Sequence, residues 1–598
     1  MVSMIALVLP TIPASAALEH PVSVIEADIF VTKFKATMRL RCFAEDLQLL
    51  QGVEPLDDGF YDSEELFDAT EDHADYLADK IELISEKGNR IAATVAEIDH
   101  FEAPEDGIRS GELMQYTIGI VLEFKFEEAP NFLTINQHII AEGLLLPSEL
   151  KILLKQEGSD DPFFKMMKPD KPETFSFDWT NPLPATDASE QERESWFEQQ
   201  REKTLGISSY SSVYSFIYIT NYQVRHEVLI PLATLTSFFE IKRTDPAFLE
   251  IAEQDVAAKR IEALFSIGNP VVIDNVTVDP VFDRIDFYGL DLKDFAMQSE
   301  RRKVSMANGR AGIIMSYSTK GMPRDVQVTW DKFNDSVQTV DSFVFAFEDA
   351  SKTEFSTFLE DNTFQWSSKD RPAPLPITNV NADAEIFGVP KLRLPMASLV
   401  LGILALPLIA ALPFTRKPLG IATISILLVG LCGATSSMFI AEYDHPYRLP
   451  QPIPEDKANS VFEQLHRNMF RAFDYHSESE IYDALARSVD GELLRQLYLE
   501  INDSLKVAEQ GGAVSRIDEV NFTGGELLPN SDSENPGFNY RSKWELLGTV
   551  AHWGHIHQRN NTYDARFRVE LIENDWKIRK MQVDDFKHDV LKTRVRRL

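Results

Sequence analysis

The sequence predicts a multidomain protein with two mostly-β sandwich-like domains, a two-helix transmembrane hairpin and a C-terminal α+β domain. A chain of 598 residues is too long for a single hydrophobic core. In the N-terminal half, apolar and polar residues alternate at several places, which is typical of strands with one buried face. Two long uncharged apolar runs follow, and helical and then strand-like patterns come after them.

The predicted boundaries follow three Pro-rich segments, because such segments form stiff, extended spacers. In chain order we predict a signal peptide (1–16), a first β-rich domain (17–155), a Pro-rich charged linker (156–205), a second β-rich domain (206–370), a linker (371–393), two transmembrane helices (394–414 and 419–441), a Pro-rich linker (442–456) and the C-terminal domain (457–590). Large soluble parts therefore flank the hairpin on both sides in the sequence.

The N-terminus has the pattern of a secretory signal. An apolar stretch from Met1 to Pro10 is followed by Ala14-Ser15-Ala16, which fits a signal-peptidase site. The stretch is too short to span a bilayer. It departs from the usual pattern in one respect, because no Lys or Arg precedes it.

The two later apolar runs, 394–414 and 419–441, carry no charged residue and are each long enough to cross a bilayer. Arg416 and Lys417 lie between them, and positive charge favours the cytoplasmic side. We therefore expect the tip in the cytoplasm and both large soluble parts on the periplasmic or extracellular side of a cell membrane. Without ionisable residues in the spans, we do not expect an ion path.

Charge and cysteine content narrow the function classes. The formal net charge is −35, and most of the acidic excess lies before the hairpin. Such a surface repels nucleic acid, so we expect no nucleic-acid partner. Cys42 and Cys432 lie in a predicted strand and a predicted membrane span. We therefore expect no disulfide between them.

The two β-rich regions show an internal repeat. A shift of 180 residues places Ile81 on Ile261 and Gly88-Asn89 on Gly268-Asn269. The shared pattern predicts a helix, a strand, a Gly-Asn turn and a strand in each region. The pattern is too short to decide whether the two domains share one fold.

The first 150 residues resemble the extracytoplasmic domain of HupE/UreJ-like membrane proteins. The residues that carry the resemblance are His20-Pro21, the strand Met38 to Cys42, and Asn131-Phe132-Leu133-Thr134-Ile135. The family is associated with metal supply to hydrogenase and urease. This chain lacks the multi-helix, His-bearing membrane core of that family, so the resemblance does not imply metal transport.

The C-terminal region combines helices and long strands. Val461, Leu465, Met469 and Phe473 recur every four residues, which predicts an amphipathic helix. Alternating apolar residues from Tyr563 to Leu571 predict a later strand. Helices followed by an antiparallel meander predict a curved sheet that wraps the helices and encloses a cone-shaped cavity.

This order resembles the NTF2-like superfamily, including its Tim44-like branch. The resemblance lies in the run Phe470 to Tyr475, the strand Arg566 to Leu571 and the segment Trp576-Lys577-Ile578. It implies the fold, but this fold hosts enzymes, binding modules and assembly factors alike.

Two groups of residues are candidates for chemistry. His552, His555 and His557 lie in one short run, and His555 and His557 would share one face of a strand, where imidazoles can bind a metal. The alternative is a polar pocket or cross-strand hydrogen bonds, and we assign no metal, cofactor or catalytic residue. Asp474, Tyr475 and His476 could serve acid–base chemistry, or could cap and pack a helix end.

The sequence contains none of the common nucleophile-elbow, zinc-protease, phosphate-loop, dinucleotide or C-x-x-C motifs. We therefore predict a membrane-anchored exoplasmic binding or assembly protein without its own catalysis, with membrane lipid and an envelope protein as its partners. Two alternatives remain open. One is a metal- or small-ligand-binding protein or enzyme that uses the NTF2-like cavity, and the other is an accessory subunit of an envelope transporter.

Overall fold

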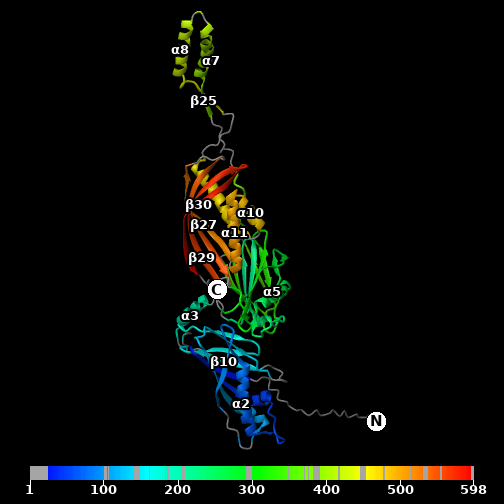
Figure 1. Ribbon diagram of the computed structural model, residues 1–598. Helices are drawn as coiled ribbons and strands as arrows, with labels where there is room; N and C mark the ends of the chain where they lie inside the picture. Colours follow the sequence, from blue (N-terminus) through cyan, green and yellow to red (C-terminus); the bar gives the residue numbers. More distant parts are fainter. Residues whose placement is uncertain are drawn as a thin grey trace, which may run out of the picture.

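The computed structural model describes residues 24–593 except 100–103, 105–106, 141–147, 160–161, 182–183, 185–187, 204–208, 291–299, 348, 370, 375, 382–390, 415, 417, 445–452, 476–477, 512–513, 530–535 and 553–554. The described part is multidomain and rich in β-sheet. Figure 1 shows its units in a row, with a pair of apolar helices at one end, then the C-terminal domain, the second β-rich domain and the first. The predicted signal peptide and His20 lie outside the described residues.

The first domain consists of two sheets and a long helix. Its elements are β1 (Val24–Val31), β2 (Lys35–Phe43), α1 (Glu45–Gln51), β3 (Phe60–Tyr61), α2 (Ser63–Lys80), β4 (Ile81–Ser85), β5 (Arg90–Ile91), β6 (Ala93–Asp99), β7 (Ile108–Arg109), η1 (Ser110–Gln115), β8 (Thr117–Lys125), β9 (Phe132–Gln137), β10 (Glu149–Gln156), β11 (Phe163–Met167) and β12 (Glu173–Ser176). The strand orders are β11-β10-β1-β2-β8-β6 and β12-β9-β4-β5. The side chain of Asp62 caps α2 by accepting from the amides of Glu64 and Glu65.

The second domain begins after α3 (Glu190–Lys203). Its elements are β13 (Tyr214–Ile219), β14 (Gln223–Pro231), α4 (Leu232–Leu235), β15 (Phe248–Leu249), α5 (Ile251–Ser266), β16 (Val271–Ile273), β17 (Val276–Val278), β18 (Val281–Tyr288), β19 (Val304–Ser305), β20 (Arg310–Ser318), β21 (Asp325–Thr329), β22 (Thr339–Ala346), β23 (Asp349–Ser356) and β24 (Thr363–Ser367). The strand orders are β18-β20-β14-β13-β22-β23 and β17-β16-β21-β24.

These two domains have the same topology. Read from the other end, the large sheet of the second domain matches that of the first strand for strand, including one parallel pair, β1 with β10 and β13 with β22. In each large sheet, one edge pair also has a register shift: β6 with β8 in the first domain and β18 with β20 in the second. Two short pairs, β3 with β7 and β15 with β19, occupy corresponding places in the chain order.

Corresponding residues in the first half of each domain lie 188 positions apart, not 180. Leu66, Ala69, His73 and Leu77 are buried on α2, and Gln254, Ala257, Ile261 and Phe265 are buried on α5. The predicted alignment of Ile81 with Ile261 does not hold, because Ile81 begins β4 whereas Ile261 lies inside α5. Gly88 lies in the β4–β5 turn, whereas Gly268 precedes β16, so the two Gly-Asn pairs are not equivalent.

The outer faces of the two large sheets differ. Glu26, Asp28 and Phe30 on β1 face solvent to varying degrees, whereas the corresponding Tyr214, Phe216 and Tyr218 on β13 are buried in an aromatic cluster. On the solvent side of a sheet, charge is tolerated, but a covered face must be apolar. The outer face of the large sheet in the second domain is therefore covered by other parts of the molecule.

The C-terminal domain is a four-stranded antiparallel meander with helices packed against it. Its elements are α9 (Glu455–Arg471), η4 (Ala472–Asp474), α10 (Glu478–Ala486), α11 (Glu492–Gly511), β27 (Val514–Leu528), β28 (Gly537–His552), β29 (His555–Ile572) and β30 (Asp575–Thr593). Helix α11 lies against β18 of the second domain. Tyr222 and Tyr475 stack across the same boundary with ring centroids 4.5 Å apart.

The segment after the second domain is bound to the C-terminal domain. Ile377 and Val380 are buried in its core. The Val380 carbonyl accepts from the amide of Trp576 at 2.8 Å, and Arg487 donates to the Ile377 carbonyl at 2.6 Å. Part of the predicted linker 371–393 is therefore held in place. Similarly, residues 163–176 of the predicted linker 156–205 form β11 and β12 of the first domain.

Two apolar helices form a separate antiparallel pair. Its elements are β25 (Lys391–Pro395), α7 (Met396–Ala411), η3 (Leu412–Phe414), α8 (Pro418–Ala434) and β26 (Ile440–Asp444), and β25 pairs with β26. Ser398 near the start of α7 donates to the Cys432 carbonyl near the end of α8 at 2.7 Å. The helices are shorter than the predicted spans, because both ends of the pair enter strands.

By length and composition, Met396–Phe414 is the one helix in the described part of the chain that could cross a membrane. Its 19 residues extend about 28 Å, close to the hydrocarbon thickness of a bilayer. Pro418–Ala434 is apolar but shorter.

Candidate functional site: a cleft between the two β-rich domains

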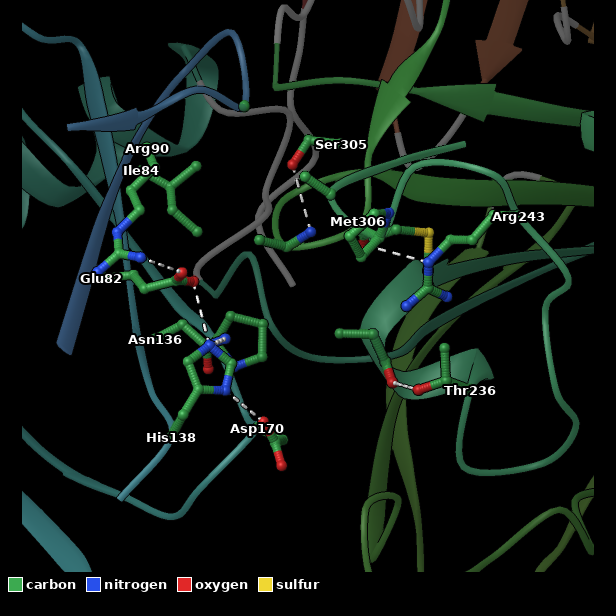
Figure 2. Close-up of a pocket in the computed structure, with 16 residues that line it drawn as sticks. Glu82, Ile84, Arg90, Asn136, His138, Asp170, Thr236, Arg243, Ser305 and Met306 are labelled. Carbon is green, nitrogen blue, oxygen red and sulfur yellow. Dashed lines mark hydrogen bonds and ion pairs between the residues drawn. The ribbon is translucent and has the colours of Figure 1, made fainter. Parts of the chain in front are cut away.

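A cleft of about 460 Å³ lies between the first and second domains (Figure 2). It is lined by Glu82, Ile84, Gly88, Arg90, Asn136, His138, Asp170 and Pro172 from the first domain and by Ala233, Thr236, Arg243, Pro246, Ala247, Ser305, Met306 and Ala307 from the second. Ligand sites often lie at such domain boundaries, because side chains from two rigid walls can converge there.

The wall from the first domain is ionic. Glu82 comes from β4, His138 directly follows β9, and Asp170 lies in the turn between β11 and β12. Strands β4 and β9 are hydrogen-bonded neighbours, which pairs Ile81 with Gln137 and brings the residues after β9 beside Glu82. Asp170 is held at this point because its amide donates to the Gln137 carbonyl at 2.9 Å.

His138 lies between two carboxylates. Its Nε2 is 3.1 Å from Oε2 of Glu82, and its Nδ1 is 2.6 Å from Oδ1 of Asp170 (Figure 2). The hydrogen bond with Glu82 is the largest cause that raises the pKa of His138 above its usual value. The same bond is the largest cause that lowers the pKa of Glu82. This wall therefore favours an imidazolium ion.

Asn136 lies beside the imidazole of His138. One end of its side-chain amide lies 3.1 Å from Nε2 of His138, and the other end is buried without a hydrogen-bond partner among the described residues. An imidazolium ion donates from both ring nitrogens, so the amide presents its oxygen, and not its NH2 group, to Nε2. Asn136 is therefore part of the hydrogen-bond network around His138.

The wall from the second domain is mostly neutral, with one arginine. In the part of the chain that the structure describes, the guanidinium of Arg243 donates to the backbone carbonyls of Pro246 at 3.1 Å and Ile241 at 3.4 Å. Glu253, whose pKa Arg243 helps to lower, is occupied by the amides of Glu250 and Thr244. Among the residues that the structure describes, no carboxylate forms a salt bridge with Arg243.

Hydrogen bonds from side chains to backbone carbonyls join the two walls. Asn308 of the second domain donates to the Ser85 carbonyl of the first at 3.0 Å. Gly88 has a φ of +85°, and a Cβ at this position would clash with Ser305. Lys171 donates to the Asp335 carbonyl at 2.9 Å. The cleft is therefore bounded by contacts that depend on the turn containing Gly88.

The charged side chains of the cleft are suited to hold a charged ligand. Within the described residues, no three His, Cys, Asp or Glu side chains are arranged to hold a metal ion. The cleft lining includes no cysteine, lysine or tyrosine, and Ser305 has no histidine among its hydrogen-bond partners in the described structure. The charged groups are Glu82, Asp170, His138 and Arg90 on one wall and Arg243 on the other.

The sequence-based candidates lie elsewhere. His552 ends β28 and His555 begins β29, and these two residues pair across a tight hairpin. Their side chains, and that of His557, lie outside the described residues, so metal binding there stays a prediction. Tyr475 packs on Tyr222, in keeping with a packing role, and His476 is outside the described residues.

The interior of the C-terminal domain is filled with aromatic side chains at the place where the sequence predicts a cone-shaped cavity. His466 on α9 is fully buried, with ring centroids 4.6 Å from Trp544 and 5.1 Å from Phe522. Within the described part of the chain, neither of its ring nitrogens has a hydrogen-bond partner. Burial lowers the pKa of His466 to about 3. This histidine is therefore a neutral core residue.

Sequence reasoning did not find the cleft. Glu82, His138 and Asp170 are widely separated in the chain, and no local motif contains them. Arg243 belongs to the other domain, so only the packing of the two domains brings it to the same space.

Comparison with protein-family models finds no match, and comparison with curated proteins also finds none. The resemblances to NTF2-like and HupE/UreJ-like proteins therefore stay predictions.

Proposed function

We propose that the chain is a membrane-anchored exoplasmic binding protein without its own catalysis, and that the interdomain cleft is its ligand site. The apolar helix pair would be the anchor. The three soluble domains would form one elongated body on the outer side, with the first domain farthest from the membrane. A protein partner in the cell envelope fits the same arrangement.

One observation carries the anchor proposal. The chain leaves the C-terminal domain after Asn381, which bridges to Asp575, and returns to it at Glu455, where α9 begins. The helix pair is therefore an excursion from a single soluble body. Both ends of the excursion must lie on the same side of any bilayer that the helices enter.

Charge distribution supports the orientation. Arg416 lies at the far tip of the pair, where positive charge favours the cytoplasm. Near the soluble body, Arg393 is neutralised by Glu442 at 3.0 Å. The apolar side chains Ile403, Leu406 and Leu427 are more than half exposed on the helix pair, as lipid contact would require.

Labelling with a membrane-impermeant maleimide tests this orientation in intact cells that express the full chain. Three single-cysteine variants are needed, Glu360→Cys, Lys580→Cys and Arg416→Cys, in a background with Cys42→Ala and Cys432→Ser. All three sites are exposed in the structure. We expect labelling of the first two without permeabilisation and of Arg416→Cys only after it. Labelling of Glu360→Cys and Lys580→Cys from opposite sides would overturn the proposal.

Removal of the helix pair tests its role as the anchor. Lys391 pairs with Asp444, which places their Cα atoms about 5 Å apart. A short Gly-Ser connection can therefore replace residues 391–444 without strain. We expect this variant to move from the membrane fraction to the soluble fraction. The far-UV circular dichroism signal that comes from the soluble domains should stay unchanged. Retention in the membrane fraction would show that another part of the chain anchors it.

A further inference from the structure

We propose that the interdomain cleft binds a small zwitterion that carries both a carboxylate and an ammonium group, the chemistry shared by free amino acids and short peptides. This inference rests on the proposed function as a binding protein. It goes further because it specifies the ligand charge that each wall would recognise.

Arg243 is the group for the ligand carboxylate. Its guanidinium satisfies backbone carbonyls but forms no salt bridge in the described structure, and the side chain is exposed on the cleft. A planar guanidinium suits a carboxylate because it can donate two parallel hydrogen bonds. Its wall offers no negative group to compete with the ligand, because the other lining residues there are neutral.

The opposite wall is suited to the ligand ammonium. Asp170 uses one carboxylate oxygen for His138, and its side chain is 64 % exposed. An ammonium group has three donors and no acceptor, so it can bind the exposed carboxylate of Asp170. Figure 2 shows His138 and Asp170 on one side of the space and Arg243 on the other.

Size and charge exclude several other ligands. The volume of about 460 Å³ suits a small molecule and is too small for a folded partner. The net charge of −35 disfavours nucleic acid. The carboxylates of Glu82 and Asp170 share their wall with two cations, His138 and Arg90. Arg243 adds one positive charge from the opposite wall. A ligand with both charges can place its carboxylate at Arg243 and its ammonium group at Asp170.

Isothermal titration calorimetry with the detergent-solubilised full chain tests the proposal. The probes are alanine, trialanine, N-acetyl-trialanine and trialanine amide. We expect alanine or trialanine to bind with a Kd below about 1 mM, and we expect blocking of either end to weaken binding at least tenfold. The comparison of alanine with trialanine distinguishes a free amino acid from a peptide.

Two variants test which wall of the cleft binds each end of the ligand. Arg243→Gln should abolish the penalty for a blocked carboxylate, and Asp170→Asn should abolish the penalty for a blocked amine. Arg260→Gln and Glu71→Gln change exposed charges outside the cleft and should leave binding unchanged. Equal binding of blocked and unblocked probes, or no heat with alanine and trialanine up to 10 mM, would overturn the proposal. Fractionation of the same cells before detergent is added reports separately on anchoring.

Discussion

Nδ1 of His138 lies 2.6 Å from Oδ1 of Asp170. Asp170 belongs to the turn that precedes β12, which begins at Glu173. The ring also contacts Glu82, which itself meets Arg90 at 3.4 Å. His138 thus links two strands and a turn that line the cleft. Its protonation state decides whether this link is ionic.

The first prediction concerns the pH dependence of the link. Since the folded-state pKa of His138 is raised, its contribution to stability is present below about pH 6.5 and is lost as the pH rises through the raised value. We expect His138→Gln to destabilise the first domain by about 0.5–1 kcal/mol at pH 6, with a smaller effect at pH 8.5.

Urea unfolding at the two pH values, followed by hydrogen exchange of β9, measures this difference. Glu82 has a lowered pKa, so its own contribution is lost only in acid, well below pH 6. The two groups therefore act in separate pH ranges. A destabilisation by His138→Gln that is equal at both pH values would contradict an ionic role.

The second prediction concerns the contact between the two β-rich domains. Gly88→Ala should lower the free energy of unfolding by more than the positive φ alone requires, because the added Cβ would also clash with Ser305. Gly59→Ala is the matched control, since its φ of +81° is similar but nothing lies within 4 Å of the added atom.

We expect Gly59→Ala to lower the free energy of unfolding by about 1 kcal/mol and Gly88→Ala to lower it by about 1–2 kcal/mol more. Small-angle X-ray scattering should also show a wider distribution of interdomain distances for Gly88→Ala alone. Equal effects of the two substitutions would mean that the domain boundary accommodates the added Cβ beside Ser305 without strain.

The third prediction concerns the neutral histidine in the C-terminal core. His466→Met removes two ring nitrogens that have no hydrogen-bond partner in the described structure and roughly conserves volume, so we expect it to stabilise this domain by about 1–3 kcal/mol. Because the folded pKa is lowered to about 3, the wild-type domain loses stability as the pH falls below 6.5. The advantage of the variant should therefore grow between pH 7 and pH 5. A variant that is less stable at both pH values would show that the imidazole packing outweighs its unmet polarity.

The fourth prediction concerns the segment that connects the second domain to the C-terminal domain. Val380→Asp places a charge at a buried position and should detach the segment, with a loss of about 2–4 kcal/mol of docking free energy. Limited proteolysis should then cut near residue 380 much faster than in the wild type. Ala373→Asp, at an exposed position of the same segment, should have no effect on the cutting rate.

The sequence alone determined the periodic features of this protein. Alternating residues such as Met38 and Leu40 are buried on β2, and the four-residue repeat of Val461, Leu465 and Met469 is buried on α9, as local patterns predict. The two apolar runs likewise became the two helices of the pair. These features depend on neighbours in the chain, which is why a local pattern suffices.

Only the tertiary structure decided the relationship between the two β-rich domains and the position of the cleft. The offset of 188 residues between the domains follows from which side chains are buried on α2 and α5. His73 and Ile261 occupy corresponding buried positions, although one is polar and the other apolar. Glu82, His138 and Arg243 converge because β4 pairs with β9 and because the two domains touch at Gly88 and Ser305. Contacts between residues far apart in the chain leave no periodic signal, so the sequence by itself could not reveal them.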